Sequence, residues 1–155
     1  MVPPLLIRDV EPADHDQWIV LFAGYRDFYL REPDDRVVET AWAWIVGREH
    51  GMHGLVAVDT DSGDRVVGLA NLRDFARPSA GAMGLFLDDL FTAPAARGRG
   101  AGAALLARAA RLAAERGAVV VRWQTASDNS TARRLYDQHA TLTPFIVYDM
   151  EPATD

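Results

Sequence analysis

The sequence predicts a mixed α/β (α+β) fold in which a twisted sheet is flanked by helices. Three observations lead to this prediction: apolar runs typical of strands alternate with segments of helical periodicity, an alanine-rich helix connects two such runs, and the length suits one domain. The chain has 155 residues and no cysteine, which excludes disulfides, thiolate metal sites and a cysteine nucleophile. We expect a single domain over residues 1–150 and a flexible tail over residues 151–155.

Strand and helix signals alternate along the first half of the chain. Short apolar runs bounded by turn residues are typical of strands, and apolar side chains three and four positions apart are typical of an amphipathic helix. Asp14 can cap the first helix, Pro33 can end it, and Asp61-Ser62-Gly63-Asp64 can form a hairpin turn. The expected elements are a strand at Leu5–Val10, helices from His15 to Pro33 and from Asp34 or Asp35 to Gly47, and strands at Leu55–Val58, Val66–Leu72 and Gly81–Thr92.

The second half of the chain contains the alanine-rich helix. This helix follows a glycine-rich loop and ends near Gly117, a residue suited to the left-handed cap of a helix C-terminus. Because the helix connects two strands, the sheet should contain at least one crossover connection. The remaining elements expected are a strand at Val119–Trp123, a helix from about Asn129 to His139, and a closing strand at Thr143–Met150.

Charge and hydropathy narrow the range of partners. The formal net charge is −6 and every basic residue is arginine, so extensive binding to a nucleic-acid backbone is not expected. No segment reaches the roughly 20 apolar residues that span a bilayer, and Met1–Val10 lacks the features of a secretory signal. We therefore expect a cytoplasmic protein that binds neither nucleic acid nor membrane. His50 and His53 have too few neighbouring ligand residues to predict a metal site.

The loop Arg97–Gly102, with the sequence Arg-Gly-Arg-Gly-Ala-Gly, is the most informative segment. The first amides of a helix lack partners within the helix, and here three glycines leave them uncovered while two arginines add positive charge. This pattern favours a phosphate site over a flexible turn. A dinucleotide site is excluded because a proline-containing loop precedes the motif and the next strand ends without an acid. A P-loop is excluded because the chain has no lysine.

Two motifs resemble those of the GNAT N-acetyltransferase superfamily. Arg97-x-x-Gly100-x-Gly102 at the start of a long helix is similar to the family's acetyl-CoA-binding motif. The later run Asn129-x-x-Ala132-x-x-x-Tyr136 is similar to the family's Asn/Tyr helix. The strand Leu87-Asp88-Asp89-Leu90-Phe91 and the helix segment Tyr25-x-x-Phe28-Tyr29 resemble the branch that acetylates diamines and polyamines. His139-Ala140 departs from the family, which has glycine and an aromatic residue there.

The resemblance implies a GNAT-like fold that binds acetyl-CoA. The loop amides would hold the diphosphate, and the strand before the loop would pair with the pantetheine arm and polarise the thioester carbonyl. Asn129 would contact the cofactor, cap its helix, or do both. The residues implied to hold the cofactor are Leu90, Phe91, Thr92, Arg97, Gly98, Arg99, Gly100, Ala101, Gly102 and Asn129.

Acetyl transfer to an amine also needs a base and an acid. An alkyl amine has a pKa of about 10.4, so deprotonation requires help near neutral pH. By its place in the branch pattern Asp88 is the expected base, acting through water, and Asp89 would orient or bind a cationic substrate. The alternative is that one or both acids pair with arginines at a strand bulge. Tyr136 is the expected acid for the departing thiolate, and its alternative role is that of a core tyrosine.

The expected reaction is transfer of an acetyl group to the primary amine of a small molecule such as a polyamine, a diamine or an amino-acid-like compound. Tyr25, Phe28 and Tyr29 are core residues by default and would wall the substrate pocket if they face the cleft. A homodimer is expected by analogy, with Phe145–Met150 as a contact. Two alternatives stay open: a non-catalytic acyl-CoA-binding regulatory module, and an acetyltransferase that acts on protein or peptide amines.

Overall fold

A five-stranded sheet organises the first of two compact units, Met1–Gln124 and Thr125–Asp155. The computed structural model describes residues 5–154. The strands are β1 (Leu5–Asp9), β2 (Met52–Asp59), β3 (Arg65–Arg77), β4 (Ala82–Thr92) and β5 (Val121–Arg122). The first unit also contains the helices α1 (His15–Phe28), α2 (Asp35–Val46) and α3 (Ala101–Glu115), and the second contains α4 (Ser130–His139).

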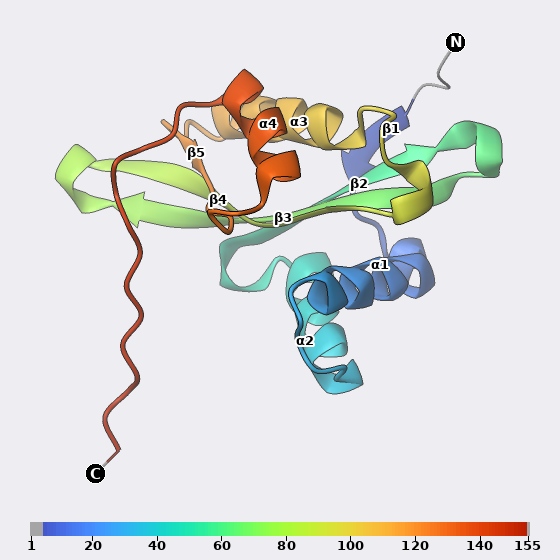
Figure 1. The fold of residues 1–155 in the computed structure, drawn as a ribbon, viewed down its shortest axis with the longest axis horizontal. Coiled ribbons are helices and arrows are strands. Elements are labelled where there is room, and N and C mark those ends of the chain that lie inside the picture. The colour runs from blue at the N-terminus through green and yellow to red at the C-terminus, as the bar shows by residue number, and fades with distance from the viewer. Residues whose placement is uncertain (1–4, 155) are drawn as a thin grey trace. The chain divides into compact units, whose positions relative to one another are not determined.

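The strands follow one another across the sheet in sequence order (Figure 1). Neighbours from β1 to β4 are antiparallel, whereas β4 and β5 are parallel and are connected through α3. A parallel pair requires such a crossover. The mixed sheet with a crossover through the alanine-rich helix is therefore confirmed.

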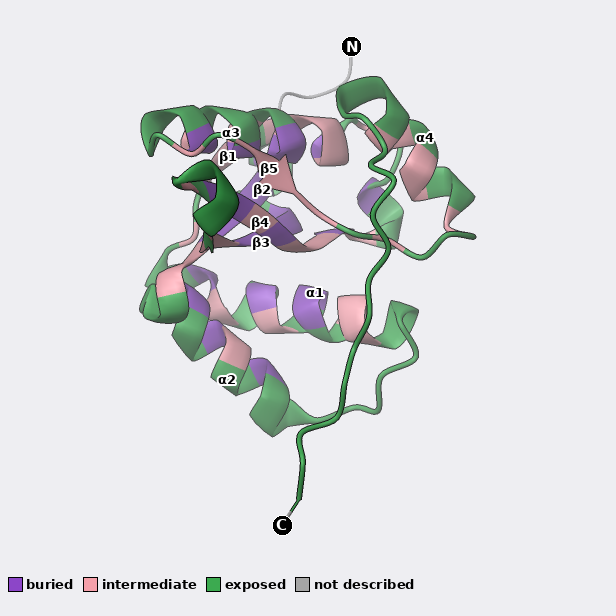
Figure 2. Cartoon of the chain, turned by 90° about the vertical axis from the view of Figure 1, so that its left-hand side faces the viewer, coloured by how far each residue is buried: buried purple, intermediate pink, exposed green. Residues whose placement is uncertain are grey.

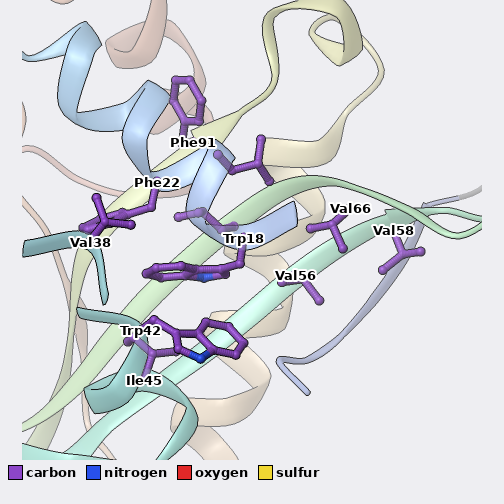
Figure 3. Packing of buried hydrophobic residues seen from close by; sticks show 11 residues of the cluster. Trp18, Phe22, Val38, Trp42, Ile45, Val56, Val58, Val66 and Phe91 are labelled. Atoms are coloured by element: carbon purple, nitrogen blue, oxygen red, sulfur yellow. The ribbon is translucent and has the colours of Figure 1, made fainter. Parts of the chain in front are cut away.

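The apolar stripes of the helices account for their positions. In the first unit, α1 and α2 lie on one face of the sheet and α3 lies on the other (Figure 1). Trp18 of α1 is fully buried, and its ring centroid lies 5.4 Å from that of Trp42 of α2 (Figure 3). Leu105 and Ala109 of α3 are fully buried, and the buried residues of the helices face the sheet (Figure 2). Within each helix the buried side chains recur every three or four positions, so the helices form an apolar core on both faces of the sheet.

A β-bulge interrupts the pairing of β3 with β4. Asn71 pairs with Asp89 and Leu72 pairs with Leu87, so Asp88 is an extra residue in β4. Such a bulge bends the strand and changes the direction of its side chains. Within the described residues, β4 pairs with β5 only at Leu85 and Phe86. The part of β4 that follows the bulge therefore has no partner on β5, which leaves an edge where another extended chain can pair.

Several predicted boundaries differ from the observed ones. α1 ends at Phe28 rather than near Pro33, because the chain turns at Leu30, where φ is +56°. Asp14 does not cap α1 with its side chain. Its buried carboxylate instead accepts hydrogen bonds from the Glu11 amide at 2.8 Å and from Arg8 at 2.8 and 2.9 Å. The carboxylate thus joins the strand to the helix start. α2 begins at Asp35, one of the two predicted starts, and Asp34 caps it by accepting from the amides of residues 36 and 37.

The predicted closing strand at Thr143–Met150 is wrong for this chain on its own. Residues 140–154 contain no helix or strand, and Phe145, Tyr148 and Met150 are 81%, 86% and 94% exposed. A strand is stabilised by hydrogen bonds to a neighbouring strand, and no described residue pairs with this segment. The predicted strand at Val119–Trp123 is reduced to two residues. Val119 and Val120 still bond to β4, through Val119 N–Met83 O and Leu85 N–Val120 O, each 2.9 Å long.

The described part of the C-terminal tail has no regular secondary structure. Residues 151–154 are exposed and irregular, and Asp155 and the first four residues lie outside the described part. The single domain over residues 1–150 stays a prediction. None of the helices within residues 5–154 has both the length and the hydropathy to cross a membrane.

Candidate active site

The glycine loop leaves its backbone open before α3. Gly98 and Gly100 have φ values of +78° and +82°, a region that residues with side chains rarely adopt. Nothing lies within 4 Å of a Cβ built on either residue. No side chain caps α3 at Gly100, and the first turn of α3 contains no acid. The first amides of α3 therefore suit a phosphate group.

The two arginines of the loop have different contacts. Arg97 donates from Nε to the carbonyl of Thr92 at 3.2 Å, and its guanidinium lies 5.5 Å from the centre of the Phe91 ring. Arg99 donates from Nη1 to the carboxylate of Asp59 at 2.7 Å. Among the described residues no carboxylate pairs with Arg97, whereas the charge of Arg99 is paired within the protein.

Asp88 forms an ion pair at the bulge. Its two carboxylate oxygens accept from Nε of Arg73 at 3.1 and 3.0 Å, and that guanidinium also lies 4.6 Å from the centre of the Phe86 ring. Burial raises the pKa of Asp88 above its ordinary value, and Arg73 only partly opposes the rise. The local contacts of Asp88 are those of the second interpretation of the sequence, an acid paired with arginine at a bulge.

Asp89 has a different environment. Its carboxylate accepts from Nδ2 of Asn71 at 3.0 Å, and Asn71 is buried. Burial raises the pKa of Asp89, and the donors Asn71 and Tyr25 only partly oppose this effect. Two adjacent acids with raised pKa values therefore lie at the bulge, one held by a cation and one by neutral donors.

Tyr25 connects α1 to this bulge. Its hydroxyl donates to the backbone carbonyl of Asp88 at 3.3 Å and lies beside the Asp89 carboxylate. Burial and the nearby Asp89 raise the pKa of Tyr25, so its hydroxyl stays protonated and acts as a donor. The Tyr25 ring packs against those of Tyr29 and Phe91, with centroids 4.9 and 6.2 Å away. Tyr25 thus supports the strand that carries both acids.

A cavity of about 590 Å³ lies between α1 and the segment that joins β4 to the glycine loop. Phe28, one of the three predicted substrate residues, lines it, whereas Tyr25 and Tyr29 do not. Its charged lining residues are Asp16, Asp27, Arg65 and Arg97, and its apolar ones include Val20, Leu21 and Phe91.

The second unit contains the remaining predicted site residues. The side chain of Asn129 caps α4 by accepting from the Ala132 amide at 3.4 Å, and its Nδ2 donates to Oγ1 of Thr125 at 3.3 Å. Tyr136 lies two turns further along α4 and is partly buried. The capping role, one of the two considered for Asn129, is the one observed.

Three residues that contact the site residues were missing from the sequence prediction. Asn71 and Arg73 hold the acids, and Asp59 holds Arg99. Asn71 carries a recognisable signal, because it is a polar residue within an otherwise apolar strand, and a buried polar group needs a partner. Nε2 of His53 lies 3.4 Å from Oδ1 of Asp74. Residues 5–154 hold no group of three or more His, Asp or Glu side chains suited to a metal ion.

Comparisons with known proteins identify the family of the chain. The model of the acetyltransferase (GNAT) family matches residues 15–140. The D-amino-acid N-acetyltransferase HPA3 of Saccharomyces cerevisiae is 26% identical over 144 residues, covering 93% of this chain and 89% of that protein. An uncharacterized N-acetyltransferase of Bacillus subtilis, YhfO, is 30% identical over 133 residues, covering 86% and 87%.

Solved structures share the fold. A probable acetyltransferase superposes with a TM-score of 0.84 at 23% identity, covering 97% of this chain and 99% of the other. The enzyme AAC(6')-Iy, solved with the bisubstrate analogue CoA-S-monomethyl-acetylneamine, gives a TM-score of 0.79 at 18% identity with the same coverage. The chain therefore belongs to the GNAT family of acetyltransferases and is an N-acetyltransferase that uses acetyl-CoA.

Proposed function

We propose that this enzyme acetylates the primary amine of a small cationic molecule: a polyamine, a diamine or an amino-acid-like compound. The observation that carries the proposal is the pair of acids at the bulge, Asp88 and Asp89, both with raised pKa values in a partly buried setting. Partly buried carboxylates suit an amine that must bind as a cation and then lose a proton. The net charge of −6 also favours the approach of a cation. Among the relatives, the yeast protein is named a D-amino-acid N-acetyltransferase.

The cofactor side of the site would consist of the glycine loop and the end of β4. Acetyl-CoA supplies the acetyl thioester. The amides of Gly98–Gly102 would hold its diphosphate at the open start of α3. The edge Leu90–Thr92, which has no partner on β5, would pair with the pantetheine arm as an added strand does. Arg97, which no described carboxylate neutralises, would add positive charge beside the loop, and Asn129 would contribute from α4.

Asp88 is the proposed base, acting through water. Its side chain is about one-quarter exposed and can be reached by water, and Arg73 keeps the carboxylate ionised while burial raises its proton affinity. As the N–C bond forms, Asp88 would accept, through that water, the proton that the amine loses. Asp89, hydrogen-bonded to Asn71 and beside the hydroxyl of Tyr25, would hold the bulge and attract the cation.

Tyr136 is the proposed acid. A phenol has a pKa near 10 and a thiol one near 8.5, so proton transfer from the phenol to a thiolate is uphill by about 1.5 pKa units, a cost of about 2 kcal/mol that leaves the transfer feasible once the C–S bond breaks. Tyr136 would donate its proton to that sulfur. Its place in the Asn129-x-x-Ala132-x-x-x-Tyr136 motif of the family supports this role.

Release of free thiol from acetyl-CoA tests the proposal. The protein would be incubated with acetyl-CoA and with spermidine, putrescine, D- and L-amino acids, an aminoglycoside and a peptide with a free N-terminus. We expect turnover with free small amines. Cofactor binding without turnover on any amine would indicate a non-catalytic acyl-CoA-binding module. Faster turnover of the peptide would indicate an enzyme acting on protein amines.

We also propose that the enzyme is a homodimer joined through its C-terminal segment. Phe145–Met150 carries five large exposed apolar side chains on an irregular segment. A second copy offers the same segment, so two of them can pair as antiparallel strands about a two-fold axis and remove this surface from water. Light scattering should give the mass of a dimer for the full chain. Phe145→Ser combined with Ile146→Ser should give the mass of a monomer, and an unchanged mass in this variant would refute the contact.

A further inference from the structure

The carboxylate of Asp59 connects two segments that are far apart in the sequence. Asp59 ends β2, and its side chain is 5% exposed. It accepts from the amide of Asp61 at 3.2 Å and from the hydroxyl of Ser62 at 2.9 Å, and so shapes the 3₁₀ turn Thr60–Ser62 that leads to β3. It also accepts from Arg99 at 2.7 Å. The turn between β2 and β3 is thus tied to the glycine loop.

Arg99 supplies the one side chain in the stretch Gly98-Arg99-Gly100. Both glycines adopt left-handed backbone conformations, and no atom lies within 4 Å of a Cβ built on either of them. Glycine backbones are conformationally permissive and lose much entropy when fixed. The carbonyl of Gly100 accepts from the Ala104 amide at 3.0 Å, which ties one end of this stretch to α3. The side-chain anchor of the stretch is Arg99, which is three-quarters buried and bonded to Asp59.

The pairing also controls the local charge. Asp59 is an acid buried behind a loop that suits an anion, and an unpaired negative charge there would oppose a diphosphate. Arg99 neutralises that charge, and the same contact lowers the pKa of Asp59. Arg99, engaged by Asp59, can therefore affect a bound anion only indirectly, by shaping the loop and by neutralising the buried acid. The charge of Arg97, which no carboxylate of residues 5–154 neutralises, can act on an anion directly.

We propose that Asp59 and Arg99 are a positioning pair that holds the glycine loop in the shape required by the diphosphate of acetyl-CoA. This inference rests on the proposed cofactor site. Arg99 acts through Asp59 and not as a phosphate ligand. A preorganised loop spares the ligand the cost of ordering it. Asp59 and Arg99 are 40 positions apart in the sequence. Their proposed role concerns the cofactor and does not require contact with the amine substrate.

The test compares Asp59→Asn, Arg99→Gln and the double variant with the wild type. Calorimetry with free CoA gives Kd, and kinetics give KM for acetyl-CoA and kcat. Loss of a hydrogen bond to a charged group corresponds to about a tenfold change, so we expect Kd and KM to rise about tenfold in Asp59→Asn and at least as much in Arg99→Gln, with kcat changed less. The double variant should be no weaker than Arg99→Gln, because the unpaired acid is also removed.

Two outcomes would overturn the proposal. If Asp59→Asn binds CoA as the wild type does, the pair does not position the loop. If the two effects multiply in the double variant, Arg99 binds the phosphates independently of Asp59. Failure of the wild type to bind CoA would instead refute the proposed cofactor site, so the two failures are distinguishable.

Controls separate positioning from general destabilisation. S-acetylpantetheine lacks the diphosphate and the nucleotide, so its KM should be unchanged in Asp59→Asn, whereas a general loss of structure would affect both donors. Arg111→Gln removes an exposed charge from α3, and its Kd for CoA should stay within about twofold of the wild type. Arg99→Lys keeps the charge but offers a single ammonium group, and it should restore part of the affinity lost in Arg99→Gln.

Discussion

Replacing Tyr25 with phenylalanine tests whether α1 supports the bulge that carries the two acids. The change removes one hydroxyl and leaves the packing of the ring in place. The hydroxyl donates to the Asp88 carbonyl at 3.3 Å and lies beside the Asp89 carboxylate. Its loss removes the single O–H donor that lies between a half-buried carbonyl and a partly buried carboxylate. A buried acceptor left without its donor costs about 1–3 kcal/mol.

That cost has two measurable consequences. For a domain of this size, 1 kcal/mol shifts Tm by about 2–4 °C, so Tyr25→Phe should lower Tm by several degrees. If the bulge positions Asp88 for the reaction, a loss of about 1.4 kcal/mol in the transition state lowers kcat about tenfold. The pKa of Asp89 should rise further, because Tyr25 is one of the donors that lower it.

Tyr29→Phe is the matched control. Tyr29 is more exposed and packs its ring on Tyr25, and no hydrogen bond of its hydroxyl is seen among the described residues. Differential scanning calorimetry and steady-state kinetics on both variants separate the hydroxyl from the ring. Equal, small effects of the two substitutions would refute the role assigned to Tyr25.

Three further predictions concern the two carboxylates at the bulge, the tyrosine on α4 and a glycine in the core. An ionised base is needed for turnover, so kcat/KM should rise with pH through the pKa of Asp88, which is raised above the ordinary carboxylate value of 3.8. Asp88→Asn should abolish this rise of the pH profile, whereas Asp89→Asn should retain it. Tyr136→Phe should lower kcat at least tenfold and leave the Kd of CoA unchanged; an unchanged kcat would exclude Tyr136 as the acid. Gly54→Ala should destabilise the fold by about 1–3 kcal/mol, because a Cβ there would lie 2.4 Å from Cγ2 of Ile45 and 2.9 Å from Cγ1 of Val10, and a chemical-denaturation midpoint equal to that of the wild type would contradict this packing.

The sequence predicted the elements whose signals are local. Apolar spacing located α1, α2 and α3, and the glycines located the loop before α3, because periodicity and backbone freedom are properties of neighbouring residues. Two consecutive acids in an apolar strand pointed to an unusual site, and they lie at a bulge.

Contacts between distant residues could not be predicted in this way. Asp59 and Arg99 are 40 positions apart, and only the fold shows that the acid faces the loop. Both arginines of the loop carry the same sequence signal, yet within residues 5–154 Arg99 pairs with a carboxylate and Arg97 does not. The strand expected at Thr143–Met150 has the right composition, but a strand also requires a neighbour, which composition does not reveal.

Binding of acetyl-CoA to the wild type and to Gly100→Val tests the central claim most directly. Gly100 has a φ of +82°, which a β-branched residue rarely adopts, and its position is open to solvent or ligand. We predict saturable binding to the wild type in a calorimetric titration and binding at least tenfold weaker to Gly100→Val, with Tm lowered by only a few degrees. No heat of binding with the wild type, or equal affinity in the two proteins, would contradict the assignment of the glycine loop to the cofactor.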